Sequence, residues 1–540
     1  MKKKILGAAI TAVLMAGNAH AVLPTIASDT TVIYLSGASA SLDYVNKLLT
    51  SSAVPTADRF CDTNQEVWRF NDTIDGKTQN AFYCTKAGTN PSLAGAKSHL
   101  LIYKRSEGGS AMGVTPLISN ATVNFLNITG NATCAQTTAA VAANPLATPP
   151  VAAVVGAAAC TYDTFGTVAT QFTAAIPDFG MSDVDPIQFR GNNVPAGYSP
   201  VTADDLNALT VKGASAVVFG EPVTLQLFQA LQAAQISTGQ LPGTCTVGLK
   251  TEACLPNLTS AQIASIHSGS WTSWNSIKVG TTGLGLYDWT VANAATYKPA
   301  TADVHVCRRV DGSGTQAQHG IVFLNSPCAE ASSSTAPAHD QGSSEGDGFA
   351  MVHELETSGG VSDCLDTLNT ATQKSASAFT NYWKTGSTGD ANGAAVTGGA
   401  RWAVGIQSLE KSSANFEFVK VDGVAPTLAN VVNGTYHDWV ENTFQYNVTH
   451  YAGLTTDKKA VVDGIIAKAA LPEVMAALNT GFVHTAGNGA YLAVPSLFAP
   501  EANGAYNSAR PVNPYSRATP SAAIENCRVP TIWNSGAARM

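Results

Sequence analysis

The chain has 540 residues, of which 45% are hydrophobic and only 13% are charged, with a formal net charge of −8. This hydrophobic fraction with so little charge excludes a disordered or fibrous protein. An acidic chain is also a poor candidate for nonspecific nucleic-acid binding, so we expect no nucleic-acid partner. The length allows two or three domains with sizeable cores.

The first residues predict export. Three lysines at positions 2–4 precede an apolar run from Ile5 to Ala16, and residues 19–21 (AHA) form a small-x-small cleavage site. This pattern is typical of a cleavable secretory signal over residues 1–21. No cysteine stands directly after the cleavage point, and no later apolar run is long enough for a membrane span. We therefore expect a periplasmic or secreted protein without a lipid anchor or stable membrane insertion.

Alternating strand-like and helix-like segments predict an α/β architecture with parallel sheets. Residues 31–35 (TVIYL) read as a strand, and residues 41–49 (SLDYVNKLL) read as a helix because their apolar side chains fall on one face. Further strands are predicted at 99–103, 216–219 and 304–306, and further helices at 225–234, after the cap Thr259, and from RRVDGSGT toward Leu324.

Other segments have the composition of loop insertions. Residues 132–159 are almost purely Ala, Thr, Pro and Val, residues 329–348 are rich in Ser, Ala, Gly and Asp, and residues 385–400 are rich in Gly and Thr. The polar stretch after Pro500 predicts a wrapping tail held by Cys527.

Ten cysteines follow the signal, and their even number in an exported chain predicts disulfides. No CxxC motif occurs, which argues against a redox motif or a zinc ribbon. The histidines are scattered, so we expect structural disulfides and neither a metal site nor a cofactor. Proximity in the sequence suggests the pairs Cys61–Cys84, Cys134–Cys160 and Cys245–Cys254.

Four short motifs stand at predicted strand-to-helix turns. Such turns offer free backbone N–H groups and the positive end of a helix dipole, which favour anions. Arg309 adds a guanidinium that can donate two parallel hydrogen bonds to one oxyanion, and Asp311 is placed to hold it from behind. The motifs are Gly37–Ser41 (GASAS), Gly108–Gly113 (GGSAMG), Phe179–Asp183 (FGMSD) and Arg308–Thr315 (RRVDGSGT).

Each motif also has an ordinary structural interpretation. The glycine-rich motifs could be plain turns, Asp183 could cap a helix, and Arg309 could form a surface ion pair. Four anion-competent turns in one chain nevertheless favour an anion site over these separate explanations.

Taken together, the motifs resemble the phosphate-binding proteins of phosphate ABC importers. Residues 258–276 (LTSAQIASIHSGSWTSWNS) and 420–436 (KVDGVAPTLANVVNGTY) extend the resemblance in the family's order, over about residues 31 to 450. The resemblance implies an α/β, two-lobed type II periplasmic-binding-protein fold with loop insertions. It places the first lobe at 22–215, the second at 216–440, and a return to the first lobe plus a C-terminal tail at 441–540.

The resemblance also implies the ligand and its contacts. Asp183 favours phosphate over sulfate, because phosphate keeps a proton at neutral pH that a carboxylate can accept, whereas sulfate has none. Ser41 stands where the family usually has Thr, and Ala111 where it usually has a second Ser. The contacts carried over are Ser41, the Leu42 backbone, Ser110, Asp183, Arg309, Ser313, Gly314 and Thr315, with Asp311 in support.

We therefore expect a monomeric exported protein that binds inorganic phosphate, is not an enzyme, and serves uptake through an ABC transporter permease. One alternative is a phosphate-scavenging or surface protein of the same fold without a permease. The other is a secreted hydrolase or phosphatase, because residues 342–346 (GSSEG) match G-x-S-x-G. No apolar strand precedes this match, so the context of a nucleophile elbow is missing. A phosphatase would also need a metal cluster or a nucleophile beside a base, and the sequence shows neither pattern.

Overall fold

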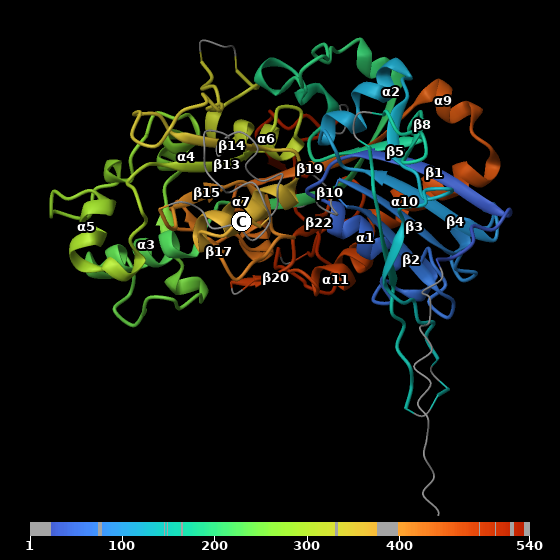
Figure 1. Ribbon diagram of the computed structural model, residues 1–540, viewed down its shortest axis with the longest axis horizontal. Helices are drawn as coiled ribbons and strands as arrows, with labels where there is room; N and C mark the ends of the chain where they lie inside the picture. Colours follow the sequence, from blue (N-terminus) through green and yellow to red (C-terminus); the bar gives the residue numbers. More distant parts are fainter. Residues whose placement is uncertain are drawn as a thin grey trace, which may run out of the picture.

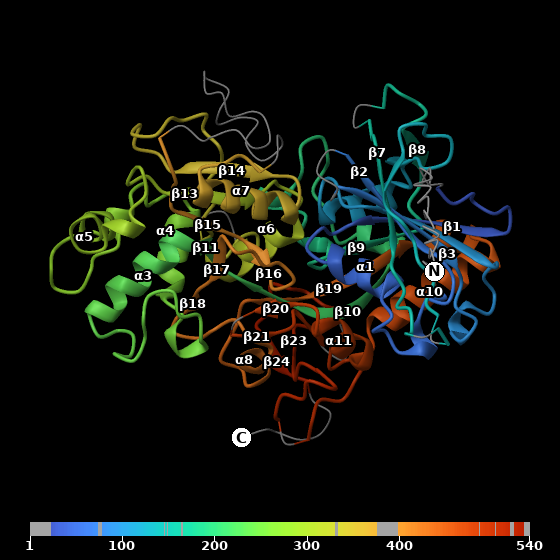
Figure 2. The ribbon, with the colours of Figure 1, turned by 60° about the horizontal axis from the view of Figure 1, so that its bottom comes forward.

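The computed structural model describes residues 23–533, apart from 74–77, 145, 148, 164–165, 330–332, 375–397, 485, 503 and 519–522. Two β-sheets with their helices lie side by side (Figures 1 and 2), which confirms the predicted α/β class. The predicted signal at 1–21 lies outside the described residues, as does most of the predicted loop at 385–400. No helix in the described part of the chain has the length and apolar character to cross a membrane.

Strands from the N-terminal and C-terminal parts of the chain form the larger sheet. Its order is β16-β10-β19-β9-β1-β4-β3-β2-β7-β6, and β22 also pairs with β10. The neighbours β9, β1 and β4 are parallel, so their carboxyl ends meet at one edge of the sheet. The strands are β1 (Thr30–Gly37), β2 (Val67–Asp72), β3 (Gln79–Thr85), β4 (His99–Arg105), β6 (Ala135–Thr138), β7 (Gly156–Cys160), β9 (Phe179–Ser182), β10 (Leu209–Gly220), β16 (Gln407–Ser408), β19 (Trp439–Asn447) and β22 (Tyr491–Ala493).

Helices cover this sheet, among them α10, which packs against β1 and β10. The predicted amphipathic helix is α1, whose Leu42, Val45, Leu48 and Leu49 side chains are buried as expected. The helices of this part are α1 (Leu42–Thr50), α2 (Thr115–Ser119), α9 (Val448–Gly453), α10 (Thr456–Ala469) and α11 (Pro472–Asn479).

The middle of the chain forms the smaller sheet, in the order β14-β13-β15-β11-β17. Thr259 caps α4, as the sequence predicts, and it also forms a capping box with Gln262. A π-helical turn at Gly320–Leu324 prolongs α6 toward Leu324. The elements are β11 (Pro222–Thr224), β13 (His305–Arg309), β14 (Met351–Leu355), β15 (Ala403–Gly405), β17 (Phe416–Phe418), α3 (Leu225–Ser237), α4 (Ser260–His267), α5 (Leu286–Asn293), α6 (Gly314–His319), α7 (Ser358–Thr370) and α8 (Leu428–Val432).

The chain crosses between the two sheets more than once. Glu221 joins β10 to β11, Ile406 joins β15 to β16, and β19 follows the loop after α8. The crossing strands β16, β10 and β19 lie next to one another in the larger sheet. The predicted lobe boundaries after residues 215 and 440 fall inside β10 and β19, so both lie in strands that connect the sheets.

Residues 132–159, expected to be a loop insertion, instead extend the larger sheet through β6 and β7. Their small side chains allow this, because β7 runs beside β2 and its first residue, Gly156, faces the Trp68 ring. A Cβ at Gly156 would lie 2.7 Å from that ring, so only a glycine fits there. Residues 329–348 contain no helix or strand among their described positions, as predicted.

Short two-stranded ladders complete the fold. They are β5 (Val123–Leu126) with β8 (Phe172–Ala175), β12 (Asn257–Leu258) with β18 (Lys420–Val421), β20 (Val483–His484) with β21 (Gly487–Asn488), and β23 (Tyr515–Ser516) with β24 (Thr531–Ile532).

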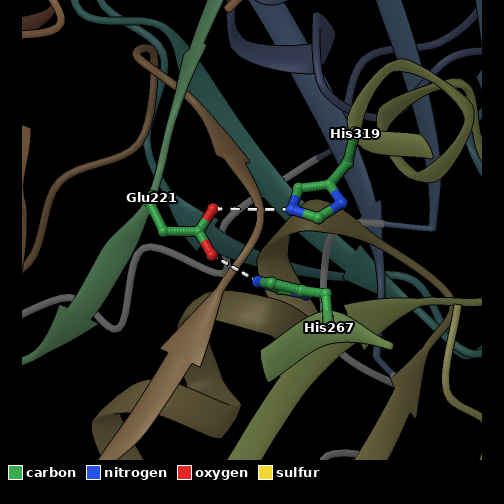
Figure 3. Close-up of side chains that lie close together, drawn as sticks. All are labelled: Glu221, His267 and His319. Carbon is green, nitrogen blue, oxygen red and sulfur yellow. Dashed lines mark hydrogen bonds and ion pairs between the residues drawn. The ribbon is translucent and has the colours of Figure 1, made fainter. Parts of the chain in front are cut away.

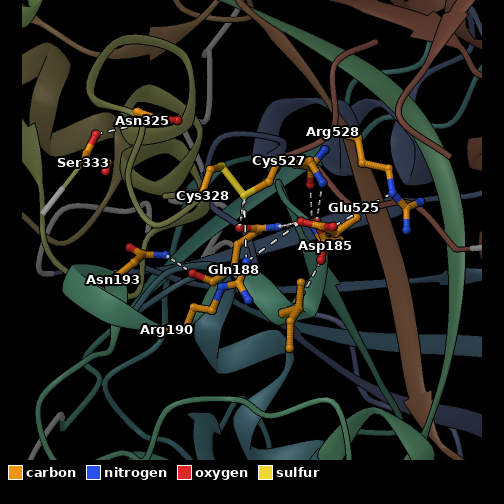
Figure 4. The surroundings of a disulfide bond; sticks show 12 residues. Asp185, Gln188, Arg190, Asn193, Asn325, Cys328, Ser333, Glu525, Cys527 and Arg528 are labelled. Carbon is orange, nitrogen blue, oxygen red and sulfur yellow. Dashed lines mark hydrogen bonds and ion pairs between the residues drawn. A yellow bond between two sulfur atoms is a disulfide. The ribbon is translucent and has the colours of Figure 1, made fainter. Parts of the chain in front are cut away.

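All ten cysteines form disulfides, and the three predicted pairs are confirmed. The other two are Cys307–Cys364 and Cys328–Cys527. The last one holds the C-terminal tail (Figure 4), as predicted for Cys527. Beside it, the backbone amide of Asn526 donates to the Asp185 carboxylate at 2.7 Å, and the Asp185 amide donates back to the Asn526 side chain at 2.6 Å.

Candidate functional site

Three of the predicted motifs meet at the carboxyl edge of the larger sheet. Ser41, Ser110 and Asp183 follow β1, β4 and β9, which are neighbouring parallel strands. The hydroxyls of Ser41 and Ser110 donate to the two oxygens of the Asp183 carboxylate, at 3.5 and 3.2 Å. The Asp183 amide donates in turn to the Ser110 hydroxyl at 3.1 Å. The sheet thus forms a compact cluster of hydroxyls around one carboxylate.

The fourth motif reaches this cluster from the smaller sheet. Thr315, in the first turn of α6, donates its hydroxyl to the same Asp183 oxygen as Ser110, at 3.2 Å. Gly314 allows this approach, because a Cβ there would lie 2.5 Å from the Ser110 hydroxyl and 2.8 Å from the Asp183 Cβ. The Ala111 amide also donates to the Gly312 carbonyl at 2.8 Å. The two sheets therefore touch at the candidate site.

Arg309 ends β13 and is completely buried. Its guanidinium donates from Nε to the Leu355 carbonyl at 3.1 Å, from Nη2 to the Glu356 carbonyl at 2.6 Å, and from Nη1 to the Ser358 hydroxyl at 3.1 Å. These three bonds fix the plane of a group that has five N–H donors, so two N–H groups remain outside these bonds. Burial lowers the pKa of Arg309 to about 10, although the Asp183 charge opposes this, and the group stays cationic at neutral pH.

The buried Asp183 carboxyl group is the acidic counterpart of the basic Arg309. Burial raises its pKa, while the positive charges of Arg309 and Lys104 and the hydroxyl bonds from Ser110 and Thr315 lower it in part. A carboxylate this deep needs hydrogen-bond donors, because an unsatisfied buried acceptor costs about 1–3 kcal/mol, and more when charged. Asp183 is therefore a strong acceptor for any proton that a ligand presents.

Two further serines, Ser39 and Ser358, belong to the cluster, although the sequence analysis did not select them. The Ser358 amide donates to the Ser39 hydroxyl at 3.3 Å, and the two hydroxyls lie 3.5 Å apart. Ser39 lies inside the GASAS motif. Ser358 begins α7 after β14, and Thr357 caps that helix. The strand at 351–355 followed by TSGG is thus a fifth strand-to-helix turn, and the same pattern search could have found it.

Lys104 is a further buried group near Asp183 that the sequence did not reveal. Its ammonium donates to the Ala38 carbonyl at 3.0 Å, to the Ser106 hydroxyl at 3.1 Å, and to the Gly37 carbonyl. Burial lowers the pKa of Lys104 to about 7, while the charge of Asp183 opposes that shift. A lysine near the end of an apolar strand normally reaches solvent, so its burial depends on the turn that follows β1.

The amides at the start of α1 are engaged within the protein. The Leu42 amide, predicted to contact the ligand, donates to the Ser39 carbonyl at 3.3 Å. The next two amides, of Asp43 and Tyr44, donate to the Glu410 carboxylate at 3.4 and 3.2 Å. Burial raises the pKa of Glu410 to about 7. This carboxylate accepts from the amides at the positive end of α1, so these amides already have partners within the protein.

Two residues of RRVDGSGT make contacts within the protein itself. Asp311 was predicted to hold Arg309, and this is wrong, because its carboxylate pairs with Arg308 at 2.7 Å. Arg308 and Arg309 are adjacent strand residues, so their side chains leave β13 on opposite faces. The Ser313 hydroxyl accepts from the Gln316 amide at 3.3 Å and thereby caps α6.

The G-x-S-x-G match at 342–346 forms no nucleophile elbow. It lies in irregular chain with no strand directly before it. Its Glu345 carboxylate is bound by Arg401 at 2.7 and 2.9 Å and lies 3.1 Å from His305. These contacts are those of a structural ion pair.

Comparison of the sequence with family models and with curated proteins finds no match. Among solved structures, the chain is similar to a Clostridium perfringens protein assigned as the substrate-binding component of a phosphate ABC transporter, with bound phosphate. The two share 14% identity with a TM-score of 0.35, over 83% of this chain and 98% of the other.

Two further similar structures are of the same kind. An ABC-type phosphate transport receptor from Vibrio cholerae shares 13% identity with a TM-score of 0.25, over 54% of this chain and 79% of its own. PstS from Borrelia burgdorferi shares 10% identity with a TM-score of 0.22, over 54% and 78%. Overlap and identity this low transfer no ligand to this chain.

Proposed function

We propose that this chain binds inorganic phosphate between its two sheets, at the cluster around Asp183. The observation that carries the proposal is the buried Asp183 carboxylate, which accepts hydrogen bonds from hydroxyls of both sheets, those of Ser110 and Thr315. The buried guanidinium of Arg309 lies close to it. The donors suit an oxyanion, and the single carboxylate suits an oxyanion that carries a proton.

Asp183 is the residue that would select among oxyanions. Phosphate carries at least one proton at neutral pH and can donate it to the carboxylate, whereas sulfate would place its own negative oxygen there. The mismatch leaves two buried acceptors facing each other, which costs about 1–3 kcal/mol or more. We expect phosphate to bind at least about tenfold more tightly than sulfate for this reason.

Ser41, Ser110, Arg309, Ser313, Gly314 and Thr315 are the proposed contacts besides Asp183. The Leu42 amide is left out because it already donates to Ser39. Anion binding would hold the two sheets together, so the strands that cross at Glu221 and Ile406 would act as the hinge. Together with the predicted signal, this supports an exported solute-binding protein that delivers phosphate to an ABC transporter permease.

Calorimetric titration of phosphate-stripped protein with phosphate and then sulfate tests the proposal. The native protein should bind one phosphate per chain and respond weakly to sulfate. Asp183→Asn should lower the affinity for phosphate at least about tenfold. It should also reduce the difference between the phosphate and sulfate affinities, because an amide can donate a hydrogen bond to sulfate. Asp311→Asn is the matched control, since Asp311 pairs with Arg308 instead, and it should bind like the native protein.

Heat from neither anion would refute a phosphate site. Equal phosphate affinity in Asp183→Asn would refute the role of the carboxylate. A phosphate-uptake assay with and without a permease then separates importer service from scavenging.

A further inference from the structure

A second buried cluster lies where the chain crosses between the sheets. Glu221 is the residue between β10 and β11, His267 ends α4, and His319 ends α6. Figure 3 shows the three side chains pointing toward one another from these three elements. All three are almost completely buried, with at most 2% of any of them exposed.

The geometry brings one donor atom of each side chain together. The Nε2 atom of His267 contacts one oxygen of Glu221, and the Nε2 atom of His319 lies 3.7 Å from the other oxygen. The two imidazole rings are 4.0 Å apart between centroids and tilted by 49°. One ligand atom from each residue lies within 4.8 Å of the other two. A single ion could therefore touch all three.

The polar atoms of this cluster do not satisfy one another's hydrogen-bonding capacity. Within the described residues, the second oxygen of Glu221 and both ring nitrogens of His319 have no hydrogen-bond partner. Buried polar atoms without partners are rare, because each forfeits its bonds to water. The three groups are acceptors or have adaptable protonation, so a cation is the partner that satisfies them together.

We propose that Glu221, His267 and His319 form a binding site for one divalent transition-metal ion, with Zn²⁺ as the best fit. Two imidazoles and one carboxylate are donors that Zn²⁺ accepts readily, whereas Ca²⁺ and Mg²⁺ prefer sets composed of oxygen. Three protein ligands leave a fourth position for water. This site is separate from the proposed phosphate site and does not depend on it.

A second histidine pair in the same half of the molecule shows why this cluster is singled out. His305 and His353 stack with ring centroids 5.5 Å apart, and His305 lies 3.1 Å from Glu345. There the protein supplies its own cation, because Arg401 holds the Glu345 carboxylate through two bonds. No arginine or lysine pairs with Glu221 within the described residues, so its charge is balanced only by histidine.

The position of the site gives the ion a structural role. It would join the crossover residue Glu221 to the ends of α4 and α6. The other end of α6 carries Thr315, which bonds to Asp183. The ion would therefore brace the smaller sheet at the point where it meets the larger one, and we expect Zn²⁺ to raise the thermal stability of the protein.

Metal analysis of protein without a histidine tag tests the site. Native protein stripped with a chelator should take up one Zn²⁺ per chain in competition with a chromophoric chelator. Glu221→Gln, His267→Gln and His319→Gln should each lower the Zn²⁺ affinity at least about 100-fold. His339→Gln is the matched control, because His339 pairs with Glu354 at 2.9 Å near the surface, and it should bind like the native protein.

Cobalt substitution of the native protein guards against variants that fail to fold. Bound Co²⁺ should give the visible absorption of a four-coordinate site with nitrogen ligands, and Zn²⁺ should abolish it at one equivalent. The absence of both Zn²⁺ uptake and this absorption would overturn the proposal. Unchanged affinity in folded ligand variants, or an equal loss in His339→Gln, would also overturn it.

Discussion

The Thr315 hydroxyl donates to the Asp183 carboxylate at 3.2 Å across a separation of 132 residues. Thr315 belongs to the helix that follows a strand of the smaller sheet, and Asp183 follows a strand of the larger sheet. This bond therefore links the two sheets through the group that we propose to recognise phosphate. Phosphate bound at this position would contact both sheets at once, so its binding would be coupled to their approach.

Arg309→Lys should weaken phosphate binding by about 10–100-fold. The substitution keeps the positive charge but removes the planar guanidinium. In the native protein this group donates to Leu355, Glu356 and Ser358 and has further N–H groups for an oxyanion. Hydrogen bonds to charged groups are worth about 1.5–3 kcal/mol, which sets this range. Calorimetry measures it. Arg308→Lys, at a position bonded to Asp311 and the Ala338 carbonyl, should leave the affinity nearly unchanged.

Gly314→Ala should prevent the close approach of the two sheets. The added methyl would lie 2.5 Å from the Ser110 hydroxyl and 2.8 Å from the Asp183 Cβ, distances that require backbone shifts. Overpacking of this kind costs about 1–3 kcal/mol, so phosphate affinity should fall by about tenfold or more. Gly243→Ala has nothing within 4 Å of the new methyl and is the control. Equal affinities of the two variants would contradict the close contact.

Lys104 should make the stability of the free protein depend on pH. Burial lowers its pKa from 10.5 to about 7, so between these values the unfolded chain holds a proton that the folded chain has released. The free energy of unfolding must then rise with pH in this window, and the cost of the buried cation is greatest below pH 7.

Lys104→Met lacks this titration. Urea unfolding should be measured from about pH 6 to about pH 10. Above pH 7, the free energy of unfolding of the native protein should rise relative to that of the variant by up to about 1.4 kcal/mol per pH unit. The comparison uses the change with pH, because the variant also loses the bonds to Ala38 and Ser106 at every pH. Lys298→Met, at an exposed position, is the control. Parallel curves for the native protein and Lys104→Met would contradict the lowered pKa.

Removing the disulfide between Cys328 and Cys527 should destabilise the protein more than removing the one between Cys245 and Cys254. The first closes a separation of 199 residues and the second only 9. Loop-closure entropy gives about 5 kcal/mol for the long loop and about 2.5 kcal/mol for the short one. Two double Cys→Ser variants compared by thermal unfolding test this. Limited proteolysis should cut the tail after residue 500 only in the first variant.

Local patterns in the sequence predicted much of the fold. The apolar spacing in residues 42–49 required a helix with one buried face, and α1 has it. Thr259 and Gln262 form a capping box because both partners lie within one turn. Three disulfides between sequence neighbours were also predictable, since nearby cysteines meet at little entropic cost. These features depend on residues a few positions apart, or at most within one loop.

The candidate site shows where such inference stops. The motifs at 37–41, 108–113, 179–183 and 308–315 were identified because each is a strand-to-helix turn. Their meeting around Asp183 follows from the parallel order β9-β1-β4 and from the crossing strands. The sequence also suggested the wrong partner for Asp311, because adjacent strand residues point to opposite faces and the sheet determines which face meets the ligand.

The sequence by itself determined which segments become strands, helices and anion-competent turns, because those outcomes rest on periodicity, capping and backbone N–H groups within a few residues. Only the tertiary structure decided that Lys104 is buried near Asp183, that Ser358 joins Ser39, and that Glu410 occupies the start of α1. It alone brought Glu221, His267 and His319 together. Contacts between distant segments depend on strand order and on how the sheets cross, and no local spacing encodes either.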